Sequence, residues 1–193
     1  MLIYLSFQLY STWNLLPPTF RVIGFAPDQL SQDEFIHIIT GRAKKDSPRF
    51  AELLKEFTAR CSYVSGHEGG DQSFQALEQR LDELGERKKE QHRLFYLALP
   101  PAAFESVSAG IKKFCHSTRG NNRLIIEKPF GHDAQSSKDL QLALNKSWSE
   151  DEIFRIDHYL GKEVVNNLLA IRFGNEIFGA IWNKRHIHDI EVF

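Results

Sequence analysis

The sequence predicts an α/β fold built on a mostly parallel sheet, and two observations point to it. Apolar runs of strand length alternate along the chain with segments whose apolar residues recur at helical spacing. Two of these runs end abruptly at prolines, in "LALPP" and in "EKPFG". Because parallel sheets bind ligands beyond the carboxyl ends of their strands, the two breaks mark the expected ligand edge.

Composition limits the classes of partner. The chain has 193 residues, of which 42% are hydrophobic and 15 are Phe, so it can fill the core of one domain and part of another. With 24 Lys and Arg against 25 Asp and Glu, the net charge of −1 predicts no nucleic-acid partner and no acidic membrane surface. Cys61 and Cys115 lie far apart without a CxxC pair, which argues against a metal site and a disulfide framework. We therefore expect a cytoplasmic protein.

The first 18 residues are apolar and contain no Lys or Arg. A signal peptide needs a positively charged start and a small-residue cleavage site, and a membrane span needs about 20 mostly apolar residues. Polar residues such as Gln8 and Asn14 interrupt this segment. We expect it to be a buried element of the fold, and we expect no membrane contact.

The next part of the chain carries clear strand and helix signals. Arg21–Ala26 is a β-type run that stops before Pro27. Ser31 and Glu34 form an S-x-x-E capping box that opens a helix through "EFIHIITG". Ser47-Pro48 is a second helix start, and "CSYVSG" after that helix predicts a short strand.

The rest of the chain continues this alternation. A third helix is predicted from Asp71 to Gly85, and we expect the charged run Glu86–Arg93 after it to be a solvated connection. The continuous apolar run Leu94–Leu99 is typical of a strand buried on both faces. The remaining elements are a helix over Phe104–Phe114, a strand at Arg123–Glu127, a helix from about Ser137 to Lys146, the strand "EIFRI" and a helix from about Lys162 to Arg172.

A lysine stands at the end of a buried strand in "EKPFG". The ammonium group of Lys128 would emerge at the ligand edge, where Pro129 stiffens the chain. Such a lysine can position an anionic or hydroxyl-bearing ligand. The alternative is that it extends into solvent without a ligand. The sequence leaves both readings open.

The stretch "RIDHYLGKE" is the turn between the last strand and the last helix. His158 and Tyr159 supply side-chain donors, and Lys162 falls in the first helical turn, where the helix dipole ordinarily disfavours a cation. Free backbone N–H groups, the positive helix end and a lysine together form an anion site, most naturally for phosphate. An N-capping turn with an exposed lysine is the alternative, and we favour the anion site.

These residues also carry a family resemblance. "RIDHYLGKE", preceded by "EKPFG" and "LFYLALPP" and followed by "FGNEIFGAIWN", resembles the glucose-6-phosphate dehydrogenase family from about Leu15 to Phe193. The resemblance implies a Rossmann-like domain and an enzyme that oxidises C1 of glucose 6-phosphate. Hydride passes to NADP⁺ in this reaction, which is the first step of the pentose phosphate pathway.

The resemblance also implies roles for residues at matching positions. Asp157 would support its neighbours, and the family's general-base histidine would lie beyond Phe193, so no catalytic residue is expected within the chain. Full-length members would form homo-oligomers. The implied substrate-binding residues are Lys128, His158, Tyr159, Leu160, Gly161 and Lys162. The implied cofactor-binding residues are Lys128, Leu99, Pro100 and Phe104.

The start of the chain departs from the family pattern. The family's Gly-rich turn, G-x-x-G-D-L-A, cannot occur early in the chain because the first glycine is Gly24. Pro27 stands where the family presents an arginine suited to the 2′-phosphate of NADP. We therefore expect a sheet without its first strand and with weakened cofactor affinity. Residues 1–155 would form a partial dinucleotide-binding domain, and residues 156–193 the beginning of a C-terminal α+β substrate and dimerisation domain.

Three functional readings follow. The chain is either an incomplete representative of the enzyme, or a non-catalytic truncated form that binds sugar phosphate weakly or associates with full-length subunits. A lumenal hexose-6-phosphate relative is the third. His188 and Asp189 do not suit a catalytic dyad, because neighbours on a strand point to opposite faces. We expect little or no turnover from the 193-residue chain alone.

Overall fold

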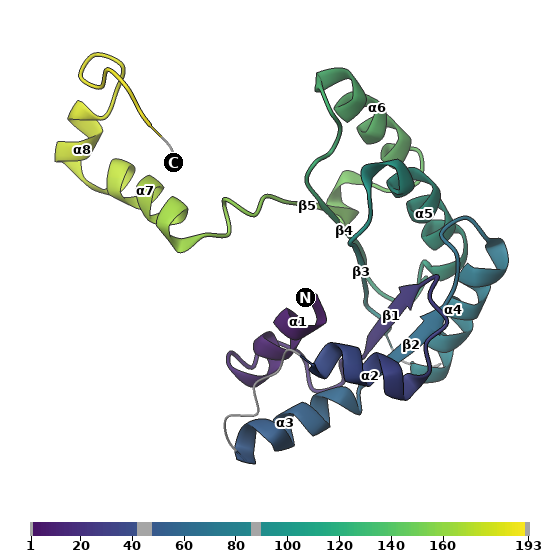
Figure 1. Ribbon diagram of the computed structural model, residues 1–193. Helices are drawn as coiled ribbons and strands as arrows, with labels where there is room; N and C mark the ends of the chain where they lie inside the picture. The colour runs from purple at the N-terminus through teal and green to yellow at the C-terminus, as the bar shows by residue number, and fades with distance from the viewer. Residues whose placement is uncertain (1, 42–47, 86–89, 192–193) are drawn as a thin grey trace.

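The computed structural model describes residues 2–41, 48–85 and 90–191. Helices and strands alternate through most of this range, as Figure 1 shows. The helices are α1 (Leu2–Ser11), α2 (Gln32–Thr40), α3 (Pro48–Thr58), α4 (Asp71–Leu84), α5 (Phe104–Gly110), α6 (Ala134–Asn145), α7 (Glu163–Gly174) and α8 (Glu176–Ile181). The strands are β1 (Val22–Ala26), β2 (Cys61–Ser65), β3 (Arg93–Leu97), β4 (Asn122–Glu127) and β5 (Ile153–Ile156). Short helical turns are η1 (Pro101–Ala103), η2 (Ile111–Cys115) and η3 (Glu150–Glu152).

The strands form two parallel sheets, which confirms the predicted fold class. β1 pairs with β2, and β3, β4 and β5 pair in that order, with every ladder parallel. In a doubly wound sheet of order 3-2-1-4-5-6, the edges formed by β1 and β3 would flank the first strand. In the described ranges no further strand pairs with either edge. The two described sheets thus end at β1 and β3, on either side of the position of a first strand.

Two hydrophobic clusters hold these elements together. The larger one packs α4, α5 and α6 against the three-stranded sheet and contains Phe74, Leu97 and Leu124. Ile23 and Phe25 of β1 pack against the same cluster, so the two sheets share one core. The smaller cluster joins α1, α2, α3 and β2. Phe7 of α1 is buried in it, as expected for the apolar first segment.

Local signals in the sequence place several boundaries correctly. The capping box forms: the Ser31 hydroxyl accepts the Glu34 N–H at 3.3 Å, and the Ser31 N–H donates to Glu34 Oε2 at 2.8 Å. α4 ends at Gly85, as predicted. α3 begins at Pro48, whereas its expected cap, Ser47, lies outside the described residues.

Two expectations about burial are wrong. Leu94 of β3 is 59% exposed, so the apolar run is not buried on both faces. Leu94 lies in register with exposed Arg123, on a sheet face that the packed helices leave uncovered. The charged run Glu86–Arg93 was expected to be a solvated connection, but its last residue is not exposed to solvent. Arg93 is buried, and its guanidinium donates to Glu78 Oε2 at 2.5 Å and to the Cys115 carbonyl at 2.6 Å. Residues 86–89 of that run lie outside the described ranges.

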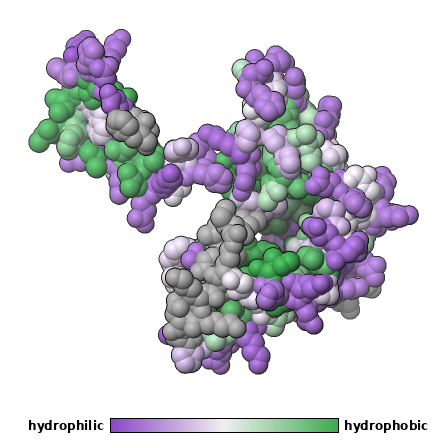
Figure 2. All heavy atoms as spheres, viewed as in Figure 1, coloured by the Kyte–Doolittle hydropathy of each residue, from purple (hydrophilic) through white to green (hydrophobic). Residues whose placement is uncertain are grey.

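The last part of the chain stands apart from the rest (Figure 1). We call residues 157–191 the arm and the described residues before it the body. α7 and α8 of the arm contact each other and contain no buried residue. Hydrophobic atoms therefore lie open over them, as Figure 2 shows. In the described ranges, no helix combines the length and apolar character that crossing a bilayer requires.

Candidate functional site

The candidate site lies where β3, β4 and β5 end together. The register pairs Leu97 of β3 with Ile126 of β4, and Glu127 of β4 with Ile156 of β5. Since the strands are parallel, the segments that follow them leave the sheet at one edge. "LALPP", "EKPFG" and "DHYLGK" are these segments. The structure thus places the predicted ligand-edge motifs side by side.

Lys128 and Asp157 bridge the ends of β4 and β5. Lys128 Nζ donates to Asp157 Oδ2 at 2.5 Å, and the Tyr159 N–H donates to Asp157 Oδ1 at 3.0 Å. The Lys128 hydrogen bond and then the Tyr159 N–H hold the pKa of the Asp157 carboxyl below its usual value. Lys128 is therefore fixed at the edge although its side chain is 51% exposed. The structure holds this lysine through Asp157, and its role toward a ligand stays a prediction.

The turn after β5 brings a lysine and a tyrosine together. Lys162 Nζ lies 4.7 Å from the centre of the Tyr159 ring, and the Lys162 N–H donates to the Tyr159 carbonyl at 3.2 Å. Lys162 is also the N-cap of α7 and makes no side-chain capping bond. Because the first hydrogen bonds of the helix are donated by Val165 and Asn166, the N–H groups of Glu163 and Val164 are available to an anion. Leu160 and Gly161 form the exposed crest of this turn.

His158 is directed toward the sheet. Its Nε2 lies 3.8 Å from Glu127 Oε2 at the end of β4, and its side chain is largely exposed. Glu127 in turn accepts a hydrogen bond from the Tyr96 hydroxyl of β3. Burial, and then this hydrogen bond, raise the pKa of Tyr96 to about 12. Sequence reasoning missed Tyr96 and Glu127. Strand alternation was the available signal, since Tyr96 pairs with Ile125, two residues before Glu127.

Comparisons with known proteins identify the family. Residues 3–167 match the family described as "Glucose-6-phosphate dehydrogenase, NAD binding domain". The chain belongs to the glucose-6-phosphate dehydrogenase family. A glucose-6-phosphate 1-dehydrogenase of Emericella nidulans is 45% identical over 93% of the chain and 35% of the relative's own length. The corresponding protein of Aspergillus niger is 44% identical over 96% of the chain and 36% of the relative.

Solved structures of the family agree in fold. A structure described as glucose-6-phosphate dehydrogenase in complex with its substrate glucose-6-phosphate has a TM-score of 0.83 at 41% identity. It matches 95% of this chain, which covers 38% of that structure. The enzyme from Mycobacterium avium has a TM-score of 0.73 at 28% identity, with 96% and 39% covered. The chain thus spans about a third of the length of the curated relatives. The matching family model is an NAD-binding domain, which supports a nicotinamide dinucleotide as cofactor.

One residue that the family resemblance assigned to the cofactor lies elsewhere. Phe104 is 1% exposed and belongs to the core cluster, because it opens α5 on the side that packs against the sheet. Its ring therefore lies in the core and not at the open ligand edge. Leu99 packs partly against the same core, and Pro100 remains exposed at the edge. Only the backbone of these two residues suits a cofactor contact.

The segment after β1 does not fit the 2′-phosphate of NADP. Pro27 follows the strand, and the Tyr63 hydroxyl donates to the carbonyls of Ala26 and Asp28 at 3.1 and 2.8 Å. The start of α2 is already closed by the Glu34 carboxylate of the capping box, which would repel phosphate. The described residues before β1 contain no glycine that would let the backbone approach a phosphate closely.

Metal and thiol chemistry find little support in the structure. No group of three His, Cys, Asp or Glu side chains in the described ranges lies close enough to hold a metal ion. Burial raises the pKa of both thiols, Cys61 and Cys115, to about 12. Both therefore remain protonated at neutral pH, and neither is a nucleophile.

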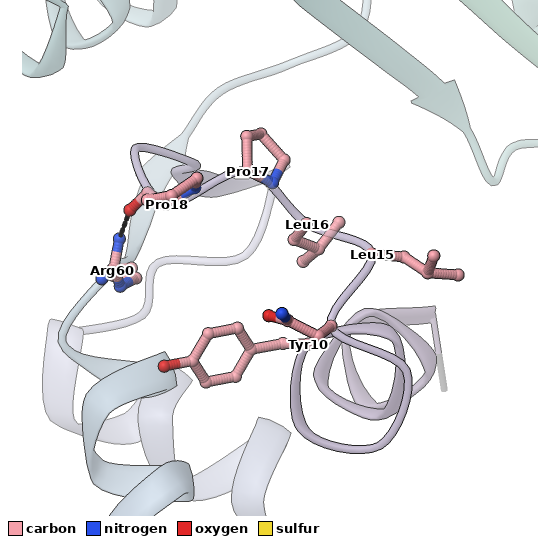
Figure 3. A pocket seen from close by; sticks show the side chains of 7 residues that line it. Tyr10, Leu15, Leu16, Pro17, Pro18 and Arg60 are labelled. Carbon is pink, nitrogen blue, oxygen red and sulfur yellow. Dashed lines mark hydrogen bonds between the residues drawn. The ribbon is translucent and has the colours of Figure 1, made fainter.

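A hollow among the described residues is remote from the candidate site. It has a volume of about 530 Å³ and lies beside the amino ends of β1 and β2, with Tyr10, Pro18 and Arg60 in its wall (Figure 3). Arg60 donates to the Pro18 carbonyl, and the Tyr10 hydroxyl donates to Glu56 at 2.7 Å. The Tyr10 and Arg60 side chains are thus engaged with the protein itself.

The end of the chain corrects one more expectation. His188 and Asp189 do not lie on a strand, and their side chains form a hydrogen bond. The argument that they point to opposite faces is therefore wrong. Both side chains are largely open to solvent in the arm, with 96% of His188 and 73% of Asp189 exposed. The contact by itself gives no catalytic site.

Proposed function

We propose that the chain is the dinucleotide-binding part of a glucose-6-phosphate dehydrogenase together with the start of its substrate domain. The reaction oxidises C1 of glucose 6-phosphate and passes hydride to NADP⁺, as the first step of the pentose phosphate pathway. The observation that supports this most is the turn after β5, where Lys162 and Tyr159 lie together at a helix N-terminus. A related structure, 41% identical, is described as a complex with glucose 6-phosphate.

In this proposal the turn binds the phosphate group of the substrate. Lys162 supplies a positive charge, His158 and Tyr159 supply side-chain donors, and the helix start supplies backbone N–H groups. Leu160 and Gly161 give the turn its shape. Lys128, now bonded to Asp157, would share its ammonium group with a sugar hydroxyl, since an ammonium group has three donors. Asp157 links the turn to the end of β4, because it accepts hydrogen bonds from both Lys128 and the Tyr159 N–H.

Fewer groups of the chain are available to contact the cofactor than to contact the substrate. NADP⁺, when bound, accepts the hydride. Lys128 and the backbone at Leu99 and Pro100 are the groups that could border its nicotinamide end. Because the segment after β1 does not fit the 2′-phosphate of NADP, we propose that the 193-residue chain binds NADP weakly. We place the boundary between the two domains near residue 155, at the end of β5. The residues before it pack into a core, whereas the helices after it contain no buried residue.

A second candidate is the non-catalytic form. It is favoured by the arm, whose exposed apolar residues, such as Val164 and Phe173, suit association with longer subunits of the same family. Both candidates predict little NADP⁺ reduction by the chain alone, because the segment after β1 does not fit the 2′-phosphate of NADP. We propose a cytoplasmic location for either. A steady-state assay showing normal NADP⁺ reduction by the 193-residue chain would contradict both.

Calorimetric titration with glucose 6-phosphate tests the shared claim. We expect Lys162→Ala to weaken binding about tenfold or more, since a charge-assisted contact to phosphate is lost. Lys146→Ala is the matched control, because Lys146 is an exposed lysine near the end of α6. It should leave the affinity unchanged, and unphosphorylated glucose should bind both proteins equally weakly. Equal affinity of wild type and Lys162→Ala for the phosphorylated sugar would remove the lysine from the proposed role.

A further inference from the structure

Tyr96, Glu127 and His158 form a row across the carboxyl end of the three-stranded sheet. Tyr96 of β3 is in register with Ile125, and Glu127 lies two residues further along β4 on the same face. Glu127 is in register with Ile156 of β5, and His158 lies two residues beyond it. Strand alternation brings Tyr96 and Glu127 to one face of the ligand edge, and the turn after β5 brings His158 next to Glu127.

The contacts along this row are sequential. The Tyr96 hydroxyl donates to Glu127 Oε1, and Glu127 Oε2 faces His158 Nε2 at 3.8 Å. Exposure increases along the same path, from the partly buried Tyr96 to Glu127, with 32% of its side chain exposed, and then to His158, with 61% exposed. One end of the row is thus anchored in the body, and the other reaches the turn that belongs to the arm.

We propose that Tyr96 and Glu127 are positioning residues that orient His158 for the phosphate group of the substrate. The inference rests on the proposed function of the turn and assigns two residues that do not themselves touch the ligand. Tyr96 fixes one carboxylate oxygen of Glu127, so that the other is held toward Nε2 of the imidazole. Nδ1 is then the ring nitrogen left for the ligand, and a doubly protonated ring donates to the carboxylate and to phosphate at once.

Two properties of the row favour this role over a simple structural one. His158 sits on an exposed turn with no buried residue around it, so packing alone does not set its ring orientation. Carboxylates commonly orient imidazole rings through the nitrogen that faces away from the ligand. A carboxylate without hydrogen-bond donors beside a phosphate site would instead repel the ligand and weaken its binding. In the observed row, both oxygens of Glu127 face donors, Tyr96 and His158.

A double-mutant cycle on the full 193-residue chain separates these effects. Glucose 6-phosphate affinity is measured for Glu127→Ala, His158→Ala and the double variant. We expect Glu127→Ala to weaken binding about tenfold, and the double variant to bind no more weakly than His158→Ala alone. Glu105→Ala is the matched control, because Glu105 also makes a 3.8 Å ion pair, with Lys146, on the remote helix α5. It should leave the affinity unchanged.

A second measurement follows the ring itself. Tyr96→Phe keeps the aromatic ring and its packing but removes the hydroxyl that anchors Glu127. The NMR signals of the His158 ring should shift in Tyr96→Phe and in Glu127→Ala, and should stay in place in Glu105→Ala. Unchanged ring signals in the first two variants would overturn the positioning role even if binding weakened.

The outcomes also distinguish this inference from the proposed function. If His158→Ala weakens binding while Glu127→Ala leaves it unchanged or tightens it, only the positioning role is overturned. Additive losses in the double variant overturn it as well. If neither His158→Ala nor Lys162→Ala affects binding, the phosphate turn itself is wrong, and the positioning role falls with it.

Discussion

The body and the arm contain comparable apolar segments, yet only the body buries them. Leu124 of β4 is 0% exposed, whereas Leu168 of α7 is 44% exposed and has its apolar neighbours in solvent too. α7 carries apolar residues over more than half of its circumference, with Arg172 among them and Glu163, Asn166 and Asn167 on the opposite side. Apolar sequence therefore specifies a helix here without specifying what the helix packs against.

The candidate site straddles the border between these two regions. Glu127 and Lys128 belong to the body, and His158, Tyr159 and Lys162 belong to the arm. Two contacts cross the border, Lys128 with Asp157 and Glu127 with His158. The geometry of the site thus depends on polar contacts at the strand ends, while the stability of the fold depends on the core of the body.

The largest expected effect separates the two regions by stability. Leu124→Ala should lower the free energy of unfolding by about 2–5 kcal/mol, because it leaves a cavity in the main cluster. The same change in the arm, Leu168→Ala, should cost no more than about 0.5 kcal/mol, since the side chain is already half in water. Urea unfolding of both variants measures the difference. Equal losses would show that α7 is packed as tightly as β4.

A smaller effect on stability depends on pH and comes from Glu152, a residue of the body. Burial opposes ionisation of Glu152, but hydrogen bonds from His116, the Ser149 N–H and Lys112 outweigh it and lower the pKa of Glu152 from 4.5 to about 2. A carboxyl with a lowered pKa stabilises the fold above its unfolded value, and this stability is lost as pH falls from about 4.5 toward 2. The contribution is on the order of 2 kcal/mol.

Urea unfolding between pH 6 and pH 2 tests this contribution. Glu152→Gln should unfold at lower urea concentration at pH 6 and should lose less stability than wild type as the solution is acidified. The arm supplies the control, since Glu163→Gln changes an exposed carboxylate at the start of α7. A wild-type pH profile that Glu152→Gln reproduces without change would contradict the assignment.

The smallest effect concerns the border itself. Asp157→Asn should weaken the contact to Lys128 and loosen the turn, so the Tyr159 N–H that donates to Asp157 should exchange with solvent about fivefold faster. Global stability should stay almost unchanged, because the contact lies at the surface. Asp189→Asn, further along the arm, should leave the Tyr159 exchange rate as it is. A large loss of global stability in Asp157→Asn would show that the border contributes to the core.

Local patterns in the sequence predict much of the fold because they act over a few residues. The Ser31–Glu34 capping box and the end of α4 at Gly85 are of this kind. Burial is harder to predict, since it depends on which elements pack where. Leu94 is exposed although its run reads as buried, and Phe104 is in the core although it reads as a cofactor neighbour.

The candidate site shows the same division. "DHYLGK" and Lys128 were identified from residue types at the end of strands, and the parallel register brings them to one edge. The link from Tyr96 through Glu127 to His158 was not found, because it requires the pairing of three strands far apart in the sequence. Arg93 was missed for a similar reason, since its partner Glu78 lies on α4.

The most direct test of the phosphate turn is a titration of glucose 6-phosphate into the ¹⁵N-labelled 193-residue chain, followed by the backbone amide signals. The account predicts that the largest shifts fall on residues 158–164, with Glu163 and Val164 prominent because their N–H groups open α7. Inorganic phosphate should move the same signals at higher concentration, and glucose should not. Shifts confined to other parts of the chain, such as the hollow beside Arg60, would contradict it.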